Sequence, residues 1–305
     1  MADAWEKSEF RSGFVCFVGR PNTGKSTLTN ALVGAKIAIT SSRPQTTRHT
    51  IRGIVHREHA QLILVDTPGL HRPRTLLGQR LNDLVRDTYS EVDVIALCIP
   101  ADEKIGPGDR WIVQQVKQMA PKTTLLGVVT KIDKVSREQV AEQLLAVSQL
   151  LGPEADVVPV SAVRGEQVEV LVDVIASKMP EGPAFYPDGE LTDEPEETLM
   201  AELIREAALE GVRDELPHSL AVVIEEILPY EDREDMLDVH ALLYVERPSQ
   251  KAIVIGKGGS RLKEVGTNAR KQIEHILGTR IYLNLHVKVA KDWQRDPKQL
   301  GKLGF

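Results

Sequence analysis

The residues whose chemistry is clearest stand within eight positions near the amino end, in the string Gly19-Arg-Pro-Asn-Thr-Gly-Lys-Ser26. Two glycines let a backbone turn tightly and aim its N–H groups at phosphate oxygens. Lys25 can place a charge beside the β- and γ-phosphates, and Ser26 can offer a hydroxyl to Mg²⁺. The string lies between an apolar run (14–18) and a helical pattern (26–33), and this context disfavours the alternative of an idle glycine turn. We therefore predict a phosphate-binding loop formed by Gly19, Arg20, Pro21, Asn22, Thr23, Gly24, Lys25, Ser26 and Thr27.

A second candidate group, Asp66-Thr-Pro-Gly69, follows the apolar run 61–66. The Asp66 carboxylate can hold Mg²⁺ through water, and the Gly69 N–H can sense a γ-phosphate. The alternative is a plain proline-glycine turn. Since the string follows a strand-like run, as the phosphate loop does, we predict that it completes the phosphate site through Asp66, Thr67, Pro68 and Gly69.

A third group points to recognition of a base, because Thr130-Lys-Ile-Asp133 ends one apolar run (124–130) and Ser161-Ala162 follows another (156–160). A carboxylate at 133 can accept hydrogen bonds from guanine N1–H and from its 2-amino group. Adenine would leave that carboxylate desolvated and unpaired. Such a tetrapeptide is common on surfaces, so the prediction depends on the other motifs. The predicted guanine site is Asp133, Lys131 with its stem over the base, Thr130, and a backbone N–H from Ser161 or Ala162.

The elements that must position these residues alternate between short apolar runs and helical patterns up to about residue 180. This alternation predicts an α/β domain with a mainly parallel sheet of six strands and helices on both faces, and ligands bind at the carboxyl ends of such strands. A stretch rich in proline, glycine and acids then predicts a linker at 181–198. The expected strands are 14–18, 49–56, 61–66, 92–99, 124–130 and 156–160, and one expected helix is 137–151.

The remaining chain predicts a smaller α+β domain at 199–295 and a tail at 296–305. Helical spacing covers 196–216 and 260–276, and strand-like runs cover 220–228, 237–246 and 279–289. The string Gly256-Lys-Gly-Gly259 fits G-x-x-G, the loop by which KH domains clamp about four nucleotides of a single strand. A G-x-x-G string alone is weak evidence for a KH domain, but here an amphipathic basic helix follows it. The predicted RNA contacts are Ile255, Gly256, Lys257, Gly258, Gly259, Arg261 and Lys263.

Charge and composition agree with this division. The 305 residues carry a net charge of −6, yet residues 251–305 hold 12 Lys and Arg against 4 Asp and Glu. A basic carboxyl-terminal part suggests a polyanion as partner. The amino end lacks the layout of a signal peptide, so we expect a cytoplasmic protein. Cys16 and Cys98 both lie in apolar runs and are interpreted as small core residues rather than a metal or redox site.

The ordered motifs resemble the Era family of bacterial GTPases, within the TrmE-Era-EngA-like superfamily, over nearly the whole chain. The resemblance includes Pro44-Gln-Thr-Thr-Arg-His49 and the run from Glu246 to Gly259. It implies a GTP-binding domain at 1–180 and a type II KH domain. It also implies slow GTP hydrolysis and binding to the 3′ end of 16S ribosomal RNA during 30S subunit biogenesis. By resemblance, Thr46 or Thr47 joins Ser26 and Asp66 as a Mg²⁺ ligand, and Asn22 binds K⁺.

Two departures from common GTPase patterns bear on activity. Family members usually carry asparagine where this chain has Thr130, so a bond to guanine N7 or to the phosphate loop could be lost. Leu70 stands where Ras-like enzymes carry a water-positioning glutamine, an apolar choice that the Era group shares. We therefore expect hydrolysis to depend on positioning and electrostatics, through Lys25, Asn22, Thr46, Thr47 and Gly69.

The expected protein is a monomeric switch in which γ-phosphate orders 38–49 and 67–78, and the linker transmits the change to the KH domain. A P-loop kinase is one alternative, which competition by GDP but not ADP would exclude. A membrane-surface regulatory GTPase, in peripheral contact with the inner face of the cell membrane, is a second, and liposome flotation distinguishes it. The third is an RNA-binding protein whose affinity for RNA is independent of nucleotide. Propensity favours strand for 252–255, whereas the family resemblance places a short helix there, and we follow the resemblance.

Overall fold

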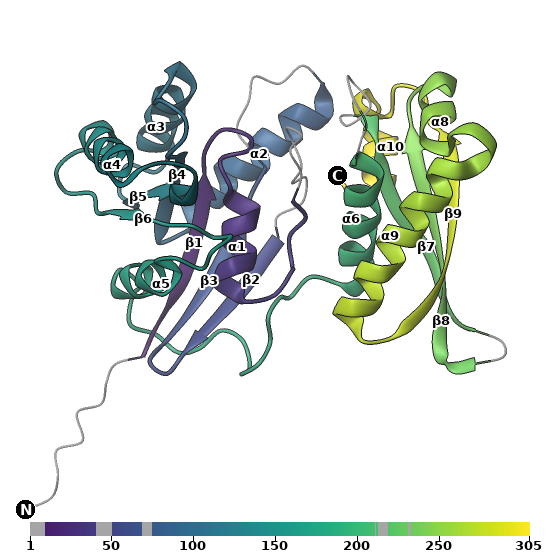
Figure 1. Cartoon of the computed structure of the whole chain (residues 1–305), viewed down its shortest axis with the longest axis horizontal. Coiled ribbons are helices and arrows are strands. Elements are labelled where there is room, and N and C mark those ends of the chain that lie inside the picture. The colour runs from purple at the N-terminus through teal and green to yellow at the C-terminus, as the bar shows by residue number, and fades with distance from the viewer. Residues whose placement is uncertain (1–9, 41–50, 69–74, 211, 213–218, 231–232) are drawn as a thin grey trace, which may run out of the picture. The chain divides into compact units, whose positions relative to one another are not determined.

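The computed structural model describes residues 10–40, 51–68, 75–210, 212, 219–230 and 233–305. The chain divides into two compact units (Figure 1). The first unit holds residues 1–37, 47–70 and 82–193, and the second holds 38–46, 71–81 and 194–305.

The first unit is built on a six-stranded sheet in the order β2-β3-β1-β4-β5-β6. Strand β2 runs antiparallel to β3, and every other neighbouring pair is parallel. The carboxyl ends of the five parallel strands therefore meet at one edge of the sheet. The strands are β1 (Arg11–Val18), β2 (Ile51–Arg57), β3 (Ala60–Asp66), β4 (Val94–Pro100), β5 (Thr124–Thr130) and β6 (Val157–Pro159).

Helices cover both faces of this sheet, as predicted (Figure 1). On one face Leu28 of α1 and Leu171 of α5 pack with Val15 and Phe17 of β1. On the other face α2, α3 and α4 pack against alternate residues of the same strands, such as Cys16. The central strands are buried on both faces, which explains their continuous apolar runs. The helices are α1 (Lys25–Val33), α2 (Leu76–Glu91), α3 (Pro107–Met119), α4 (Arg137–Leu151) and α5 (Val168–Ser177), with the short η1 (Ile132–Lys134).

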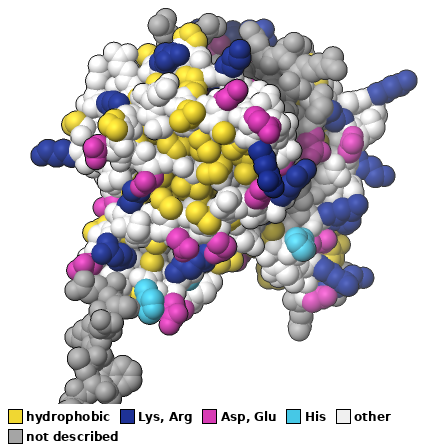
Figure 2. Space-filling model, turned by 60° about the vertical axis from the view of Figure 1, so that its left-hand side comes forward, with side chains coloured by type: hydrophobic (Ala, Val, Ile, Leu, Met, Phe, Trp, Pro, Cys, Tyr) yellow, Lys and Arg dark blue, Asp and Glu magenta, His cyan; other side chains and the backbone are white. Residues whose placement is uncertain are grey.

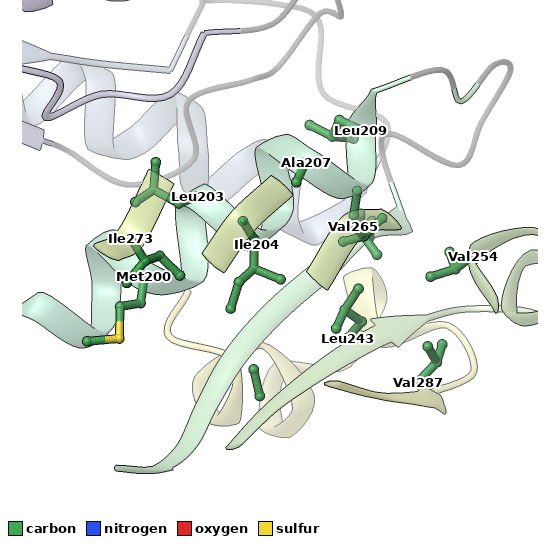
Figure 3. Packing of buried hydrophobic residues seen from close by; sticks show 14 of the residues in the cluster. Met200, Leu203, Ile204, Ala207, Leu209, Leu243, Val254, Val265, Ile273 and Val287 are labelled. Carbon is green, nitrogen blue, oxygen red and sulfur yellow. The ribbon is translucent and has the colours of Figure 1, made fainter. Parts of the chain in front are cut away.

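The second unit has a three-stranded sheet, β7-β8-β9, in which β7 and β8 are antiparallel and β8 and β9 are parallel. Its core lies between β8 and the helices α6 and α9. Figure 3 shows Ile204 of α6, Val265 of α9 and Leu243 of β8 meeting there. The elements are α6 (Glu196–Leu209), β7 (Ala221–Tyr230), β8 (Arg233–Val245), α8 (Pro248–Ile255), η2 (Lys257–Gly259), α9 (Ser260–Leu277), β9 (Arg280–Val289), η3 (Trp293–Arg295) and α10 (Pro297–Lys302).

The segment after β9 is folded onto the second unit, and this includes residues 296–305, which the sequence suggested only as a tail. Trp293 is fully buried, and its indole Nε1–H donates to the Ser219 carbonyl at 3.0 Å. Leu300 of α10 is also fully buried, and the Phe305 ring stacks on Trp293 with 5.8 Å between the ring centroids. Together these residues cover part of the sheet near Leu242 and Tyr244.

The short helix that the family resemblance placed at 252–255 is confirmed, and the strand that propensity alone favoured does not form. Pro248 occupies the first turn of α8, where its lack of an N–H costs nothing. The Gln250 side-chain carbonyl accepts the backbone N–H groups of Glu246 and Arg247 at 2.9 and 3.0 Å. Val254 is buried while its neighbour Ile253 is half exposed, so one helical face is used for packing. Capping and packing together outweigh the β-propensity of three consecutive β-branched residues.

The surface carries apolar side chains as well as charged ones. Figure 2 shows apolar side chains gathered on one face with lysine, arginine and acidic side chains around them. Since more than half of a typical protein surface is apolar, this gathering assigns no function by itself. Among the described helices, none combines the length and the apolar character that crossing a membrane requires.

Candidate functional site

The predicted phosphate loop connects the end of β1 to the start of α1 and has the tight shape that its glycines allow. A Cβ at Gly19 would lie 2.6 Å from the Cys98 carbonyl oxygen and 2.7 Å from Thr23 Oγ1, so a side chain does not fit there. Gly24 precedes the helix with φ 93° and Asn22 has φ 64°, both in the left-handed region. The loop therefore turns back over the start of α1, where backbone N–H groups concentrate partial positive charge.

The Lys25 side chain folds back onto this loop and binds two of its backbone carbonyls. Its ammonium Nζ donates to the carbonyl oxygens of Gly19, at 3.1 Å, and of Arg20, at 2.8 Å. Burial lowers the pKa of Lys25, and the nearby Asp66 carboxylate opposes that change. A cation held among backbone carbonyls and partly stripped of water is well placed to interact with a phosphate anion.

Ser26 and Asp66 come together although they are far apart in the sequence. Strands β1 and β3 are parallel with Phe17 opposite Asp66, so Asp66 lies beside the loop that follows β1. The Ser26 hydroxyl donates to Asp66 Oδ2 at 2.9 Å, and Asp66 is fully buried. A hydroxyl and a carboxylate oxygen are the hard ligands that Mg²⁺ prefers, so this pair fits the predicted metal site.

The other predicted residues of the phosphate site are only partly described. Thr67 is buried, and Pro68 borders, with Gly19 and Lys25, a gap too small to hold a water molecule. The predicted Mg²⁺ ligands Thr46 and Thr47 lie outside the described residues, as do Gly69 and Leu70.

Thr130, the residue that departs from the family's asparagine, connects the base site to the phosphate loop. Its hydroxyl Oγ1 donates to the Thr23 carbonyl at 2.6 Å, and its side chain is buried at the end of β5. The sequence left open whether threonine loses the asparagine's bond to guanine N7 or its bond to the phosphate loop. Thr130 does make a bond to the phosphate loop. The hydroxyl fixes the turn that leads into Gly24 and Lys25.

The base-recognition residues meet at the ends of β5 and β6. Because these strands are parallel neighbours, Asp133 after β5 lies next to Ser161 after β6. The Ser161 hydroxyl donates to Asp133 Oδ1 at 2.6 Å, and this bond lowers the pKa of Asp133. Lys131 has φ 58°, a left-handed conformation at the turn between β5 and η1, and Ala162 is half-buried beside Ser161. The carboxylate is thus kept ionised and oriented, as an acceptor for guanine must be.

The glycine loop of the second unit lies between α8 and α9. A Cβ at Gly256 would lie 2.7 Å from Arg261 Cβ, so this glycine allows close packing. Gly258 and Gly259 have φ of 60° and 78° with open space around them, and Lys257 is exposed. A bare backbone beside an exposed cation is what contact with a phosphodiester chain requires.

The other predicted RNA contacts differ in their surroundings. Ile255 ends α8 and packs against the core, and Lys263 is exposed. The Arg261 guanidinium instead donates to the carbonyl oxygens of Ala208, at 3.2 Å, and Glu210, at 2.5 Å. It therefore satisfies carbonyls at the end of α6, and its contact with RNA stays a prediction.

Sequence reasoning missed one contact of the phosphate loop. The Arg20 guanidinium Nε donates to Asp109 Oδ1 at 2.8 Å, across 89 positions of sequence. The string Pro107-Gly-Asp109 reads only as the start of a helix, because proline and aspartate are common in a first turn. No local pattern indicates which residue such an aspartate contacts.

Comparison with known proteins agrees with this geometry. Residues 14–131 match the family described as 50S ribosome-binding GTPase, and residues 215–294 match the KH domain family. The chain is 78% identical over 298 residues to GTPase Era of Mycolicibacterium smegmatis, which covers 98% of this chain and all of the relative. It is 74% identical over 299 residues to GTPase Era of Mycobacterium tuberculosis, with the same coverage.

Two solved structures are similar over almost the full length. One is an Aquifex aeolicus Era variant bound to GDP·AlF4−, with a TM-score of 0.92 and 38% identity over 97% of this chain and 99% of that one. The other is Era in complex with MgGDPNP and nucleotides 1506–1542 of 16S ribosomal RNA, with the same TM-score, identity and coverage. These likenesses extend over both units.

We expect Thr130→Val to weaken nucleotide binding. Valine keeps the shape of threonine but removes the hydroxyl that donates to the Thr23 carbonyl. Loss of a buried hydrogen bond costs about 1–2 kcal/mol, so the Kd for GDP should rise roughly fivefold to thirtyfold in titrations with a fluorescent GDP. Thr124→Val, at the other end of β5, is the matched control and should bind as the wild type does. Equal affinity of the Thr130→Val and Thr124→Val proteins would contradict this role.

GDP affinity should fall at low pH, and we call this fall the acid limb of GDP binding. We expect Ser161→Ala to shift the acid limb to higher pH. Asp133 must be ionised to accept hydrogen bonds from guanine, so binding is lost as pH falls through its pKa. The Ser161 bond lowers that pKa, and removing it lets Asp133 take up a proton at a higher pH. GDP affinity measured between about pH 4 and pH 7 should reveal the shift. Ser177→Ala, which removes an exposed hydroxyl on α5, should leave the acid limb in place, and an unmoved limb in Ser161→Ala would refute the assignment.

Proposed function

The chain belongs to the Era family of GTPases and hydrolyses GTP, and we propose that it is a nucleotide-controlled RNA-binding protein of the 30S ribosomal subunit. In this proposal it binds 16S ribosomal RNA near its 3′ end and acts in subunit biogenesis. One observation carries the proposal: a guanine-nucleotide site and an open glycine loop of KH type occur in one chain. The relative solved with MgGDPNP and 16S nucleotides supports it.

In the nucleotide site, each group of residues has a distinct part in the proposal. The loop from Gly19 to Thr27 binds phosphates through its backbone N–H groups. Lys25 keeps its two carbonyl partners and extends its third N–H to the β- and γ-phosphates. Ser26 and Asp66, with Thr46 or Thr47, hold Mg²⁺. That ion supplies charge that offsets the negative charge of the phosphate oxygens. Asp133 selects guanine, with Lys131, Ser161 and Ala162 around the base.

Hydrolysis in this proposal depends on positioning and electrostatics. Lys25 and the loop N–H groups, with the N–H of Gly69, stabilise negative charge that develops on the transferred phosphoryl group. Because Leu70 cannot orient a water molecule by hydrogen bonding, we propose a slow intrinsic rate.

We propose that Asn22 binds an activating K⁺ beside the phosphates. The support is the resemblance of this loop to that of related GTPases, together with the exposure of the Asn22 side chain. GTP hydrolysis should be about tenfold faster in K⁺ than in Na⁺ buffer, a difference of about 1.4 kcal/mol in the barrier. Asn22→Ala should abolish the difference while Asn30→Ala, on α1, should keep it. Identical rates of the wild type in the two buffers would exclude this role of Asn22.

In the RNA site, Lys257 and the glycine backbone are proposed to contact phosphates of a single strand. Nucleotide control would arise because γ-phosphate orders the switch segments, 38–49 and 67–78, and the linker at 181–198 passes the change on. Such coupling is reciprocal, so the RNA would also change the affinity for nucleotide. A monomeric state and peripheral membrane contact stay predictions.

The proposal is tested by binding of a short RNA from the 16S 3′ end to the protein in GTP-analogue, GDP and empty forms. We expect the tightest binding in the GTP-analogue form. Lys257→Ala should weaken binding and reduce the slope of log K against log salt by about 0.7, the value for one phosphate contact on a single strand. Gly258→Asp should abolish binding by repulsion, and aspartate tolerates the positive φ of this open position.

Lys298→Ala is the matched control, because Lys298 is an exposed lysine in the same basic region but lies on α10. It should bind RNA nearly as the wild type does. Equal binding in all three nucleotide forms would favour the alternative of an RNA-binding protein that is independent of nucleotide. Absence of binding in every form would overturn the ribosomal proposal.

A further inference from the structure

The Arg20 side chain leaves the phosphate loop and lies against the start of α3. Besides the bond from its Nε to Asp109 Oδ1, its Nη2 donates to Glu103 Oε2 at 2.9 Å. The two carboxylates differ in environment, since the Asp109 side chain is fully buried whereas that of Glu103 is 42% exposed. Charge-assisted hydrogen bonds are strong where water is excluded and weak where it is not. The contact with Asp109 is therefore the stronger of the two.

The start of α3 holds Asp109 in a fixed orientation. Its Oδ2 accepts the Gly106 backbone N–H at 2.8 Å, which leaves Oδ1 directed to Arg20. Gly108 provides the space for the arginine, because a Cβ there would lie 3.0 Å from Arg20 Cδ and 3.5 Å from Cγ. The helix start thus has both an oriented acceptor and room for the guanidinium stem.

The backbone of Arg20 belongs to the phosphate site. Its carbonyl oxygen accepts the Lys25 ammonium at 2.8 Å and the Thr23 hydroxyl at 3.0 Å. Thr23 in turn offers its own carbonyl to Thr130. Besides the bond from Ser26 to Asp66, the loop is therefore attached to the domain by the Arg20 side chain at α3 and by the Thr23 carbonyl at the end of β5.

We propose that Asp109 is a positioning residue for the phosphate loop and acts through Arg20. By holding the arginine side chain, Asp109 fixes the carbonyl that orients Lys25 and Thr23 before nucleotide binds. A loop ordered in the free protein spares the nucleotide the entropy of ordering it. GDP and GTP need the same loop, and so does the transition state. The interaction therefore acts on binding in general and not on the chemical step.

The test uses the full-length protein with Mg²⁺ and compares Asp109→Asn, Arg20→Ala and the double variant. Asparagine can still accept the Gly106 N–H, so the helix start is kept while the charge facing Arg20 is removed. We expect each single variant to release fluorescent GDP about tenfold faster, and the double variant to be no faster than the quicker single variant, because both changes remove one interaction. KM for GTP should rise by a similar factor, with kcat within about twofold of wild type.

Two control variants separate positioning from a general loss of stability. Arg57→Ala removes an exposed ion pair elsewhere in this unit, the 2.6 Å contact with Glu169, and should release GDP at the wild-type rate. Glu103→Gln removes only the exposed contact and should have a much smaller effect than Asp109→Asn. Wild-type GDP release in Asp109→Asn would overturn the proposal, and so would additive effects in the double variant.

A loss of folding in Asp109→Asn would show as a lowered melting temperature. In that case the role of Asp109 is tested by GDP release from Arg20→Lys, compared with release from Arg20→Ala. Lysine restores a cation to Asp109 and leaves α3 untouched. We expect it to recover a substantial part of the GDP retention that Arg20→Ala loses. GDP release as fast in Arg20→Lys as in Arg20→Ala would overturn the role of Asp109.

Discussion

The parallel pairing of the central strands is the constraint on which the nucleotide site depends. Because β1, β3, β4, β5 and β6 run in one direction, the segments that follow them emerge at one edge of the sheet. Ser26 and Asp66 meet there across 40 positions of sequence, and Thr130 and Thr23 meet across 107. A strand running the other way would carry its motif to the opposite edge. Each motif alone is a short loop, and the sheet combines them into a site.

The phosphate loop is held in one shape before nucleotide binds, which reduces the entropy that binding must lose to order it. Its glycines allow close contact with the strand ends, and its lysine is stabilised by two carbonyls of the loop itself. Hydrogen bonds from outside the loop then fix its shape. A site ordered in this way needs little rearrangement when a phosphate arrives, so more of the interaction energy is available for binding.

The second unit combines a packed core with an open loop. Helices α6 and α9 bury their apolar faces against the sheet, while Gly258 and Gly259 have space around them. The same stretch of chain thus changes from core packing to exposed backbone within a few residues. Arg261 belongs to the packed part, since its guanidinium binds carbonyls at the end of α6. Lys257 belongs to the exposed part and is the stronger candidate for contact with RNA.

The sequence by itself determined the chemistry and most of the local structure of this protein. The strand expected at 124–130 and the helix at 137–151 have the predicted limits, because an apolar run and a helical spacing are local signals. Lys25 begins α1, Asp66 ends β3 and Asp133 follows β5, as their flanking runs predict. Their roles as site residues stay proposals.

Only the tertiary structure decided which distant residues meet. Propensity alone favours a strand at 252–255, and the helix there, which only the family resemblance indicated, is stabilised by its cap and its packing. The folded segment around Trp293, the bond from Thr130 to the phosphate loop, and the contact of Arg20 with Asp109 were equally invisible to local patterns. The physical reason is common to all of them. Spacing and propensity report the interactions of near neighbours in the chain, whereas these contacts join residues that only the packing of strands and helices brings together.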